Sequence, residues 1–117
     1  RIASVKSPWL SKVNAGDVFA VPVSHGEGRF VADDETLARL IANGQVATQY
    51  VDLDGKPAAD IPFNPNGSVC AIECSTSPDG RVFGKMGHTE RKGDNLYFNV
   101  PGCKDPQIFE AGVEYFK

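Results

Sequence analysis

Apolar and polar residues follow one another along the chain in patterns that predict both strands and helices. A continuous apolar run at residues 17–25 has the length and β-branched content of a strand covered on both faces, and Pro22 within it indicates a sheet edge or a bulge. Acidic residues at 33–35 precede apolar residues at one-face helical spacing, and an Asn-Gly pair follows at 43–44. These signals predict a helix at about residues 34–43.

The second half of the chain contains further strand candidates and one more helix candidate. Residues 45–52 and 69–74 are predicted strands, and a Ser-Pro-Asp-Gly turn at 77–80 connects the latter to residues 81–86 as a hairpin. The C-terminal segment, 105–116, is predicted to be a helix with a proline in its first turn. The apolar face of that helix would comprise Ile108, Phe109, Gly112, Val113 and Phe116.

Length and charge exclude several classes of protein. With 117 residues, 41% of them apolar and 23% charged, the chain is long enough for one globular domain and too ordinary in composition for a disordered or fibrous protein. Its formal charge of −3 and its lack of a basic stripe argue against nucleic acid as a partner. The longest apolar run, residues 18–23, is far too short to span a membrane, so no membrane partner is expected either.

The three cysteines are too few for a disulfide scaffold, so reduced thiols in the cytoplasm are expected. On a strand, Cys70 and Cys74 would lie roughly 13 Å apart, too far to share a zinc ion, so no metal site is predicted. Both are expected to be small buried apolar residues, and Cys103, beside Pro101 and Gly102, is expected in a loop.

The motif most suggestive of catalysis is Gly87-His88-Thr89-Glu90-Arg91, which follows the predicted strand at 81–86. In an extended segment, residues two apart point to the same side, so His88 and Glu90 can form a hydrogen bond. A carboxylate on one imidazole nitrogen leaves the other nitrogen free to take a proton from a nucleophile. The alternative interpretation is a solvated polar turn after a hairpin strand.

A second candidate site follows the apolar run at 17–25. Ser24 and His25 open a glycine-containing segment that extends to Phe30, and their polar side chains suit contact with an amino-acid substrate. A tight glycine turn with a polar edge is an equally acceptable interpretation. Gly26 and Gly28 lack the third glycine and the following helix of a dinucleotide-binding fingerprint.

Five motifs in this order resemble one known family. They occupy residues 22–30, 45–52, 62–68, 76–81 and 87–91. The chain resembles the C-terminal part of the class I glutamine amidotransferase domain of phosphoribosylformylglycinamidine synthases. The resemblance implies an α/β fold, part of a flavodoxin-like amidotransferase sheet with flanking helices, in which residues 1–117 form the C-terminal half of a glutaminase domain.

The resemblance also implies an activity. In the family a Cys-His-Glu triad hydrolyses glutamine, and the ammonia passes to a synthetase that uses ATP and Mg²⁺ to convert formylglycinamide ribonucleotide to the amidine in purine biosynthesis. His88 matches the general base and Glu90 its orienting carboxylate, and we expect Ser24 and His25 to line the glutamine pocket. Many relatives have Pro-His-Pro-Glu-Arg, so Gly87 and Thr89 depart from the commoner form. No cofactor is expected within this chain itself.

One element of the triad is absent from the sequence. The family's nucleophilic cysteine lies in a Gly-x-Cys-Asn-Gly elbow that occurs nowhere here, and the chain starts at Arg1 with its only methionine at Met86. We therefore expect the elbow upstream of Arg1 and expect the chain alone to be inactive. The alternative function is a non-catalytic regulatory or ammonia-channel module. Another class I amidotransferase with a different acceptor is disfavoured by the motifs at 24–30 and 63–68.

Overall fold

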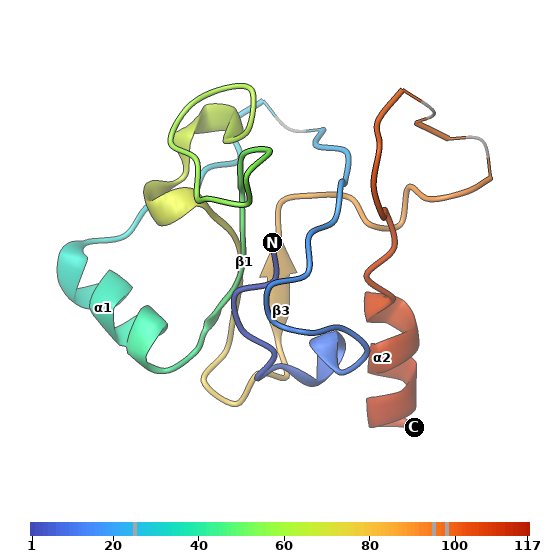
Figure 1. Ribbon diagram of the computed structural model, residues 1–117. Coiled ribbons are helices and arrows are strands. Elements are labelled where there is room, and N and C mark those ends of the chain that lie inside the picture. The colour runs from blue at the N-terminus through green and yellow to red at the C-terminus, as the bar shows by residue number, and fades with distance from the viewer. Residues whose placement is uncertain (25, 95, 98) are drawn as a thin grey trace.

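A three-stranded antiparallel sheet lies at the centre of the computed structural model (Figure 1). The structure describes residues 1–117 except 25, 95 and 98. The strands are β1 (Val46–Gln49), β2 (Ile72–Thr76) and β3 (Phe83–Lys85), in the order β1-β2-β3 across the sheet. Irregularities interrupt the pairing of β1 with β2, whereas β2 and β3 pair regularly, with Cys74 opposite Lys85.

One face of the sheet is covered by helix α1 (Asp34–Ala42). The Asp33 carboxylate accepts a hydrogen bond from the Thr36 backbone amide, and Gly44 adopts a left-handed φ of 68° just after the helix. Leu37 packs with Val46 of β1 and Ile72 of β2 in a buried cluster. The helix predicted at 34–43 is confirmed.

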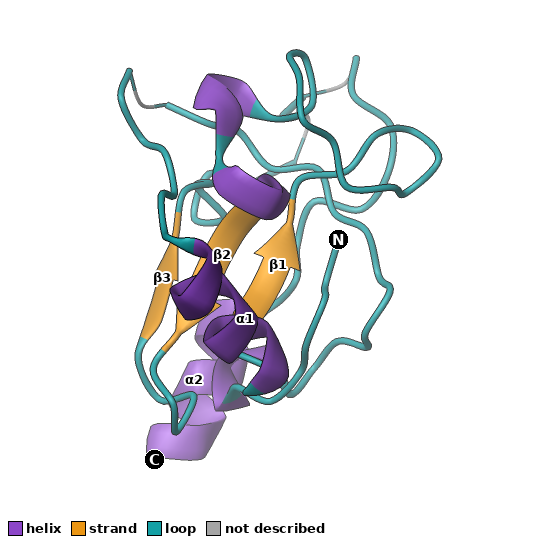
Figure 2. Cartoon of the chain, turned by 90° about the vertical axis from the view of Figure 1, so that its left-hand side faces the viewer, coloured by secondary structure: helices purple, strands orange, loops and turns teal. Residues whose placement is uncertain are grey.

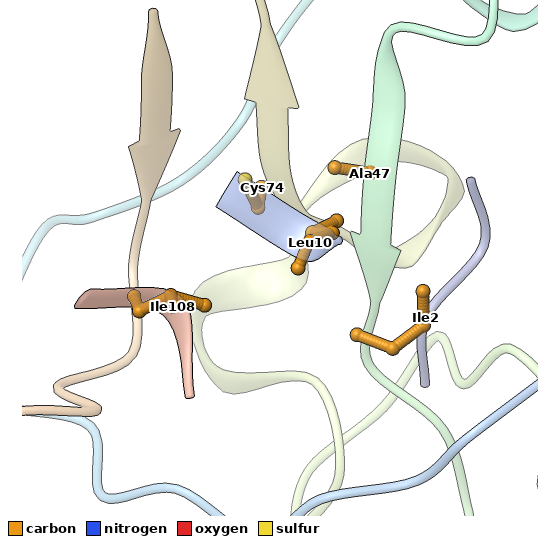
Figure 3. Close-up of a cluster of buried hydrophobic side chains, with 5 residues drawn as sticks. All are labelled: Ile2, Leu10, Ala47, Cys74 and Ile108. Carbon is orange, nitrogen blue, oxygen red and sulfur yellow. The ribbon is translucent and has the colours of Figure 1, made fainter. Parts of the chain in front are cut away.

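The opposite face carries a short 3₁₀ helix, η1 (Pro8–Leu10), and helix α2 (Ile108–Phe116). Figure 2 shows α1 in front of the sheet and α2 behind it, so the described elements form three layers. The cluster between this layer and the sheet comprises Ile2, Leu10, Ala47, Cys74 and Ile108 (Figure 3). Burial of these side chains is the main favourable contribution to the folding of this layer.

The hairpin between β2 and β3 forms as predicted. Gly80 has a φ of 76°, and the backbone amide of Gly80 donates to the Ser77 carbonyl to close the turn. β2 starts at Ile72 instead of residue 69, because Val69–Ala71 form a 3₁₀ turn. Cys70 lies in that turn and is exposed, so its predicted burial is wrong, whereas the burial of Cys74 is confirmed.

The strand predicted at residues 17–25 is wrong for its described part. Residues 17–24 join no sheet, and their backbone bonds to distant segments are isolated ones, such as Ala20 N–H to the Cys103 carbonyl. The His88 amide donates to the carbonyl of Pro22, which itself has no N–H to offer. None of residues 17–24 is fully buried, and Val18 is 50% exposed, so the predicted cover on both faces is wrong as well. An apolar run alone does not make a strand, because a strand also needs a neighbour to pair with.

Helix α2 is shorter than predicted, and of its predicted apolar face only Ile108 and Gly112 are buried. It starts at Ile108, after Pro106 and the left-handed Gln107, and Val113 is 67% exposed. The buried side of α2 consists of Ile108, Ala111 and Gly112, because the indole ring of Trp9 lies directly against Gly112. The α/β class is confirmed, and all described strands are antiparallel. No helix in the described part of the chain is long and apolar enough to cross a membrane.

Candidate active site

His88 and Glu90 lie on the segment that follows β3. The His88 Nδ1 and Glu90 Oε1 atoms are 2.6 Å apart, which confirms the contact predicted from their spacing. Both side chains reach solvent, with 32% of the His88 side chain and 54% of the Glu90 side chain exposed. The pair is therefore accessible to a small-molecule substrate.

The charge of Glu90 settles which nitrogen of His88 carries the proton. The hydrogen bond from His88 lowers the pKa of Glu90, so this carboxylate is ionised at neutral pH and only accepts hydrogen bonds. The Nδ1 atom of His88 must then be the donor. In the neutral imidazole, Nε2 has a free lone pair, which is the arrangement of a general base.

A cavity of about 370 Å³ lies beside this pair. It is lined by Trp9, Phe83, residues 85–90, Ile108 and Phe109. Three separate parts of the chain thus meet around the imidazole: η1, the β3 strand with the loop after it, and the start of α2. The volume is sufficient for a ligand of amino-acid size, and the lining combines an apolar wall with the polar pair.

A buried ion pair lies beneath the loop that carries His88. Glu73 of β2 is 7% exposed, and its Oε1 atom lies 3.1 Å from the Lys85 Nζ atom. The same Oε1 accepts a hydrogen bond of 2.6 Å from the Gly87 backbone amide, while Lys85 Nζ donates to the Gly87 carbonyl at 2.7 Å. The hydroxyl of Thr48 in β1 donates to the other oxygen of Glu73. Each polar group of this cluster therefore has a partner.

The electrostatics of this cluster favour an ionised Glu73. Burial alone would raise its pKa, but the Lys85 ammonium and the hydrogen bonds from Thr48 and Gly87 outweigh burial and leave the pKa below its ordinary value. The sequence interpretation missed Glu73 and Lys85. An acidic residue inside an apolar strand was the available signal, since such a charge needs a buried partner.

The structure does not bring Ser24 to this cavity. Ser24 is exposed and lines neither the cavity beside His88 nor a larger one of about 580 Å³ that residues 18–21 and 23 help to line. The His88 amide does donate a hydrogen bond to the carbonyl of Pro22, two residues before Ser24. His25 lies outside the described residues.

The cysteines lie elsewhere. Cys74 is buried in the core, and burial strongly raises the pKa of its thiol. Cys70 and Cys103 are exposed, and no cysteine is among the described residues that line the cavity beside His88. In the described part of the chain, no group of three or more His, Cys, Asp or Glu side chains could hold a metal ion.

Comparison with known proteins defines the class. A family model described as the CobB/CobQ-like glutamine amidotransferase domain matches residues 1–116, so the chain belongs to this family of amidotransferase domains. Its curated relatives include proteins named phosphoribosylformylglycinamidine synthase subunit PurQ, and three of them illustrate the similarity. The chain is 44% identical to the Thermomicrobium roseum protein over 115 residues, which are 97% of this chain and 48% of that protein.

The other two relatives are similar in the same way. The Methanosarcina barkeri protein is 36% identical over 115 residues, which cover 98% of this chain and 47% of the relative. The Thermus thermophilus protein is 46% identical over 95 residues, covering 81% of this chain and 40% of the relative. The family resemblance seen in the motifs is confirmed, and the chain spans about half the length of the curated relatives it matches.

Proposed function

We propose that this chain is the part of a phosphoribosylformylglycinamidine synthase glutaminase that carries the general base and its orienting carboxylate. The observation that carries the proposal is the 2.6 Å contact between His88 Nδ1 and Glu90 Oε1 beside a cavity of about 370 Å³. Membership in a glutamine amidotransferase family and similarity to relatives named as subunits of that synthase support it. The substrate of the site is then glutamine.

The geometry suits acyl transfer through a thiol. A cysteine supplied from outside these 117 residues would give its proton to Nε2 of His88, and the thiolate would attack the carboxamide carbon of glutamine. The imidazolium would return that proton to the departing nitrogen, which leaves as ammonia and yields a glutamyl thioester. Water, deprotonated by the same nitrogen, would then hydrolyse the thioester to glutamate and the free thiol. Glu90 stabilises the charged imidazolium in each half of the reaction.

The remaining parts of the proposal concern the whole protein. The ammonia would pass to a synthetase partner, and ATP and Mg²⁺ would act there, with no cofactor held by this chain. The described antiparallel sheet and its helices would be one portion of a flavodoxin-like amidotransferase sheet, whose other half carries the nucleophile. The enzyme would work in the cytoplasm, where purine biosynthesis takes place and thiols stay reduced.

Two substitutions in the full-length protein test the catalytic roles. His88→Ala should lower kcat for glutamate release by about 100-fold or more, and Glu90→Gln by about 10-fold or more, because the first removes the base and the second its orientation. Glu114→Gln changes an exposed carboxylate paired with Lys12 and serves as the matched control. If glutamate release is unchanged in His88→Ala, or is absent in the parent protein, the glutaminase proposal fails. The alternative of a non-catalytic module would then gain support.

The substrate-binding proposal has a separate test. We propose that Ser24 and His25 contact bound glutamine once it is in place; the hydrogen bond from the His88 amide to the carbonyl of Pro22, two residues before Ser24, supports this. Ser24→Ala and His25→Ala in the full-length protein should raise KM for glutamine. An unchanged KM and kcat in both variants would remove these residues from the site.

A further inference from the structure

The peptide groups next to His88 are fixed by an ion pair that does not itself reach the imidazole. Glu73 Oε1 accepts from the Gly87 amide at 2.6 Å, and Lys85 Nζ donates to the Gly87 carbonyl at 2.7 Å. Both polar backbone atoms of the residue before His88 are therefore held by one buried pair. The His88 amide is held in turn by the Pro22 carbonyl at 2.9 Å.

Gly87 packs closely against Val21 and the ion pair. A Cβ atom at this position would lie 2.5 Å from Cγ2 of Val21 and 3.0 Å from Oε1 of Glu73. Gly87 is buried, and its backbone amide contacts the Glu73 carboxylate directly. Small changes in the ion pair would therefore move the peptide that sets the direction of the His88 side chain.

We propose that Glu73 and Lys85 are positioning residues that hold His88 in its catalytic orientation through the backbone of Gly87. This inference rests on the proposed glutaminase function. Thr48 contributes to this positioning, because its hydroxyl, on the neighbouring strand β1, donates a hydrogen bond to the second carboxylate oxygen of Glu73. A chain of contacts thus runs from β1 through β2 to the loop that carries the base.

An ion pair suits this task better than a neutral contact. Gly87 presents a donor and an acceptor, and the carboxylate and the ammonium match one each with charge-assisted hydrogen bonds. A buried ion pair gives little net stability, since desolvation offsets most of the attraction between the charges. The same pair specifies a single geometry, which is what a base that must meet a thiol and a carboxamide requires.

The test uses the full-length protein and two kinds of variant. Glu73→Gln removes the negative charge, whereas Thr48→Val removes one hydrogen bond from Glu73 without changing any charge near the site. Thr48→Ser keeps the hydroxyl and is the conservative variant for rescue. Glu114→Gln, in the exposed pair with Lys12, is the control for loss of an ion pair as such.

Kinetics and hydrogen exchange provide separate readouts. We expect kcat for glutamate release, per folded molecule, to fall about 10-fold or more in Glu73→Gln and about 3-fold or more in Thr48→Val. KM for glutamine should change less than about 3-fold, because neither side chain binds substrate. The backbone amides of residues 87 and 88 should exchange faster in both variants. Thr48→Ser and Glu114→Gln should match the parent in both measurements.

The outcomes separate this inference from the proposed function. If His88→Ala abolishes activity but Glu73→Gln and Thr48→Val keep the parental kcat, the positioning role is wrong while the glutaminase function stands. The same holds if both variants lose stability alone, with an unchanged kcat per folded molecule. If the parent protein releases no glutamate, the function fails, and unchanged exchange at residues 87 and 88 in Glu73→Gln would overturn the positioning contacts independently.

Discussion

Asn64 is buried, with 1% of its surface exposed, and its side-chain amide organises the loop at residues 62–68. The Nδ2 group donates to the carbonyls of Ala58 and Ser68, and Oδ1 accepts from the Ser68 amide. Ser68 in turn bonds the Phe30 amide through its hydroxyl. Asn64 thus holds Ser68, and Ser68 connects this loop to Phe30.

Replacing Asn64 by Asp should therefore destabilise the chain. The new carboxylate would direct an oxygen toward two carbonyl oxygens, so we expect a loss of about 2–4 kcal/mol in the free energy of unfolding measured in urea. Asn66→Asp is the same chemical change in the same loop at an exposed position, where Nδ2 donates to the Gly28 carbonyl at 3.3 Å, and should cost less than about 1 kcal/mol. Equal losses in the two variants would contradict the role given to Asn64.

The stability contributed by Glu73 should depend on pH with a definite sign. Its pKa is lowered from the ordinary value of 4.5: burial opposes ionisation, but Lys85, Thr48 and Gly87 outweigh it. The ionised carboxylate therefore stabilises the folded chain fully above that value, and the contribution is lost as the pH falls through the lower folded-state pKa. The difference in urea stability between the parent chain and Glu73→Gln should be constant near neutral pH and shrink below about pH 4.5. A difference that grows on acidification would refute this sign.

At the scale of residues, sequence reasoning succeeded where the contact is local. His88 and Glu90 are two positions apart, so an extended backbone alone brings them together. Glu73 and Lys85 were missed because their contact depends on how β2 pairs with β3 and on where the loop after β3 turns. The spacing of Glu73 and Lys85 along the chain predicts neither feature.

Among the elements, the packing of α2 against η1 depends on Gly112, although glycine has a low helix propensity. A Cβ atom at Gly112 would lie 2.2 Å from a ring carbon of Trp9, so only glycine allows η1 and α2 to pack this closely. Gly112→Ala gains about 1 kcal/mol of helix propensity but adds an overpacked contact that costs about 1–3 kcal/mol. We expect net destabilisation in urea unfolding of the chain.

Two further variants identify the cause of that effect. Val113→Ala changes an exposed neighbour on the same helix and should have little effect on stability. Combining Gly112→Ala with Trp9→Leu should recover the propensity gain, because the smaller side chain leaves room for the methyl group. If Gly112→Ala is as stable as the parent chain, the close packing of Trp9 on α2 is wrong.

Elements with local start and stop signals were the ones predicted best. Asp33 and Gly44 bound α1 through contacts within a few residues, and the Ser77 to Gly80 turn fixes the hairpin in the same way. The segment at 17–25 had no such signals. Its described part forms hydrogen bonds with His88, after β3, and with Cys103. Both partners are distant from it in the sequence.

At the scale of the whole molecule, the candidate site is a product of long-range packing. Trp9, the loop at residues 85–90 and the start of α2 line one cavity, although nearly 100 positions separate the first from the last. The sequence indicated the pair within the cavity but not the walls around it. The catalytic role that the family resemblance implies for the pair stays a prediction, whereas the contact between His88 and Glu90 follows from their spacing.

The arrangement of the cysteines leads to a prediction about the isolated chain. The proposed hydrolysis of glutamine needs a thiol within reach of Nε2 of His88, and none of the described residues that line the cavity is a cysteine. Cys74 is buried with a raised pKa, so it supplies no thiolate. The 117-residue chain alone should therefore release no more glutamate from glutamine than its His88→Ala variant does.

A sensitive glutamate assay on the purified chain, with the full-length protein as the active reference, makes this measurement. Release of glutamate by the chain that His88→Ala abolishes would show that one of its own thiols reaches the base. Cys70→Ser and Cys103→Ser would then identify it, since these are the two exposed cysteines. If activity survives both substitutions but still requires His88, Cys74 must be the thiol that reaches the base. Cys74 would then have to leave the core, and the packing of β2 against η1 and α2 would be wrong.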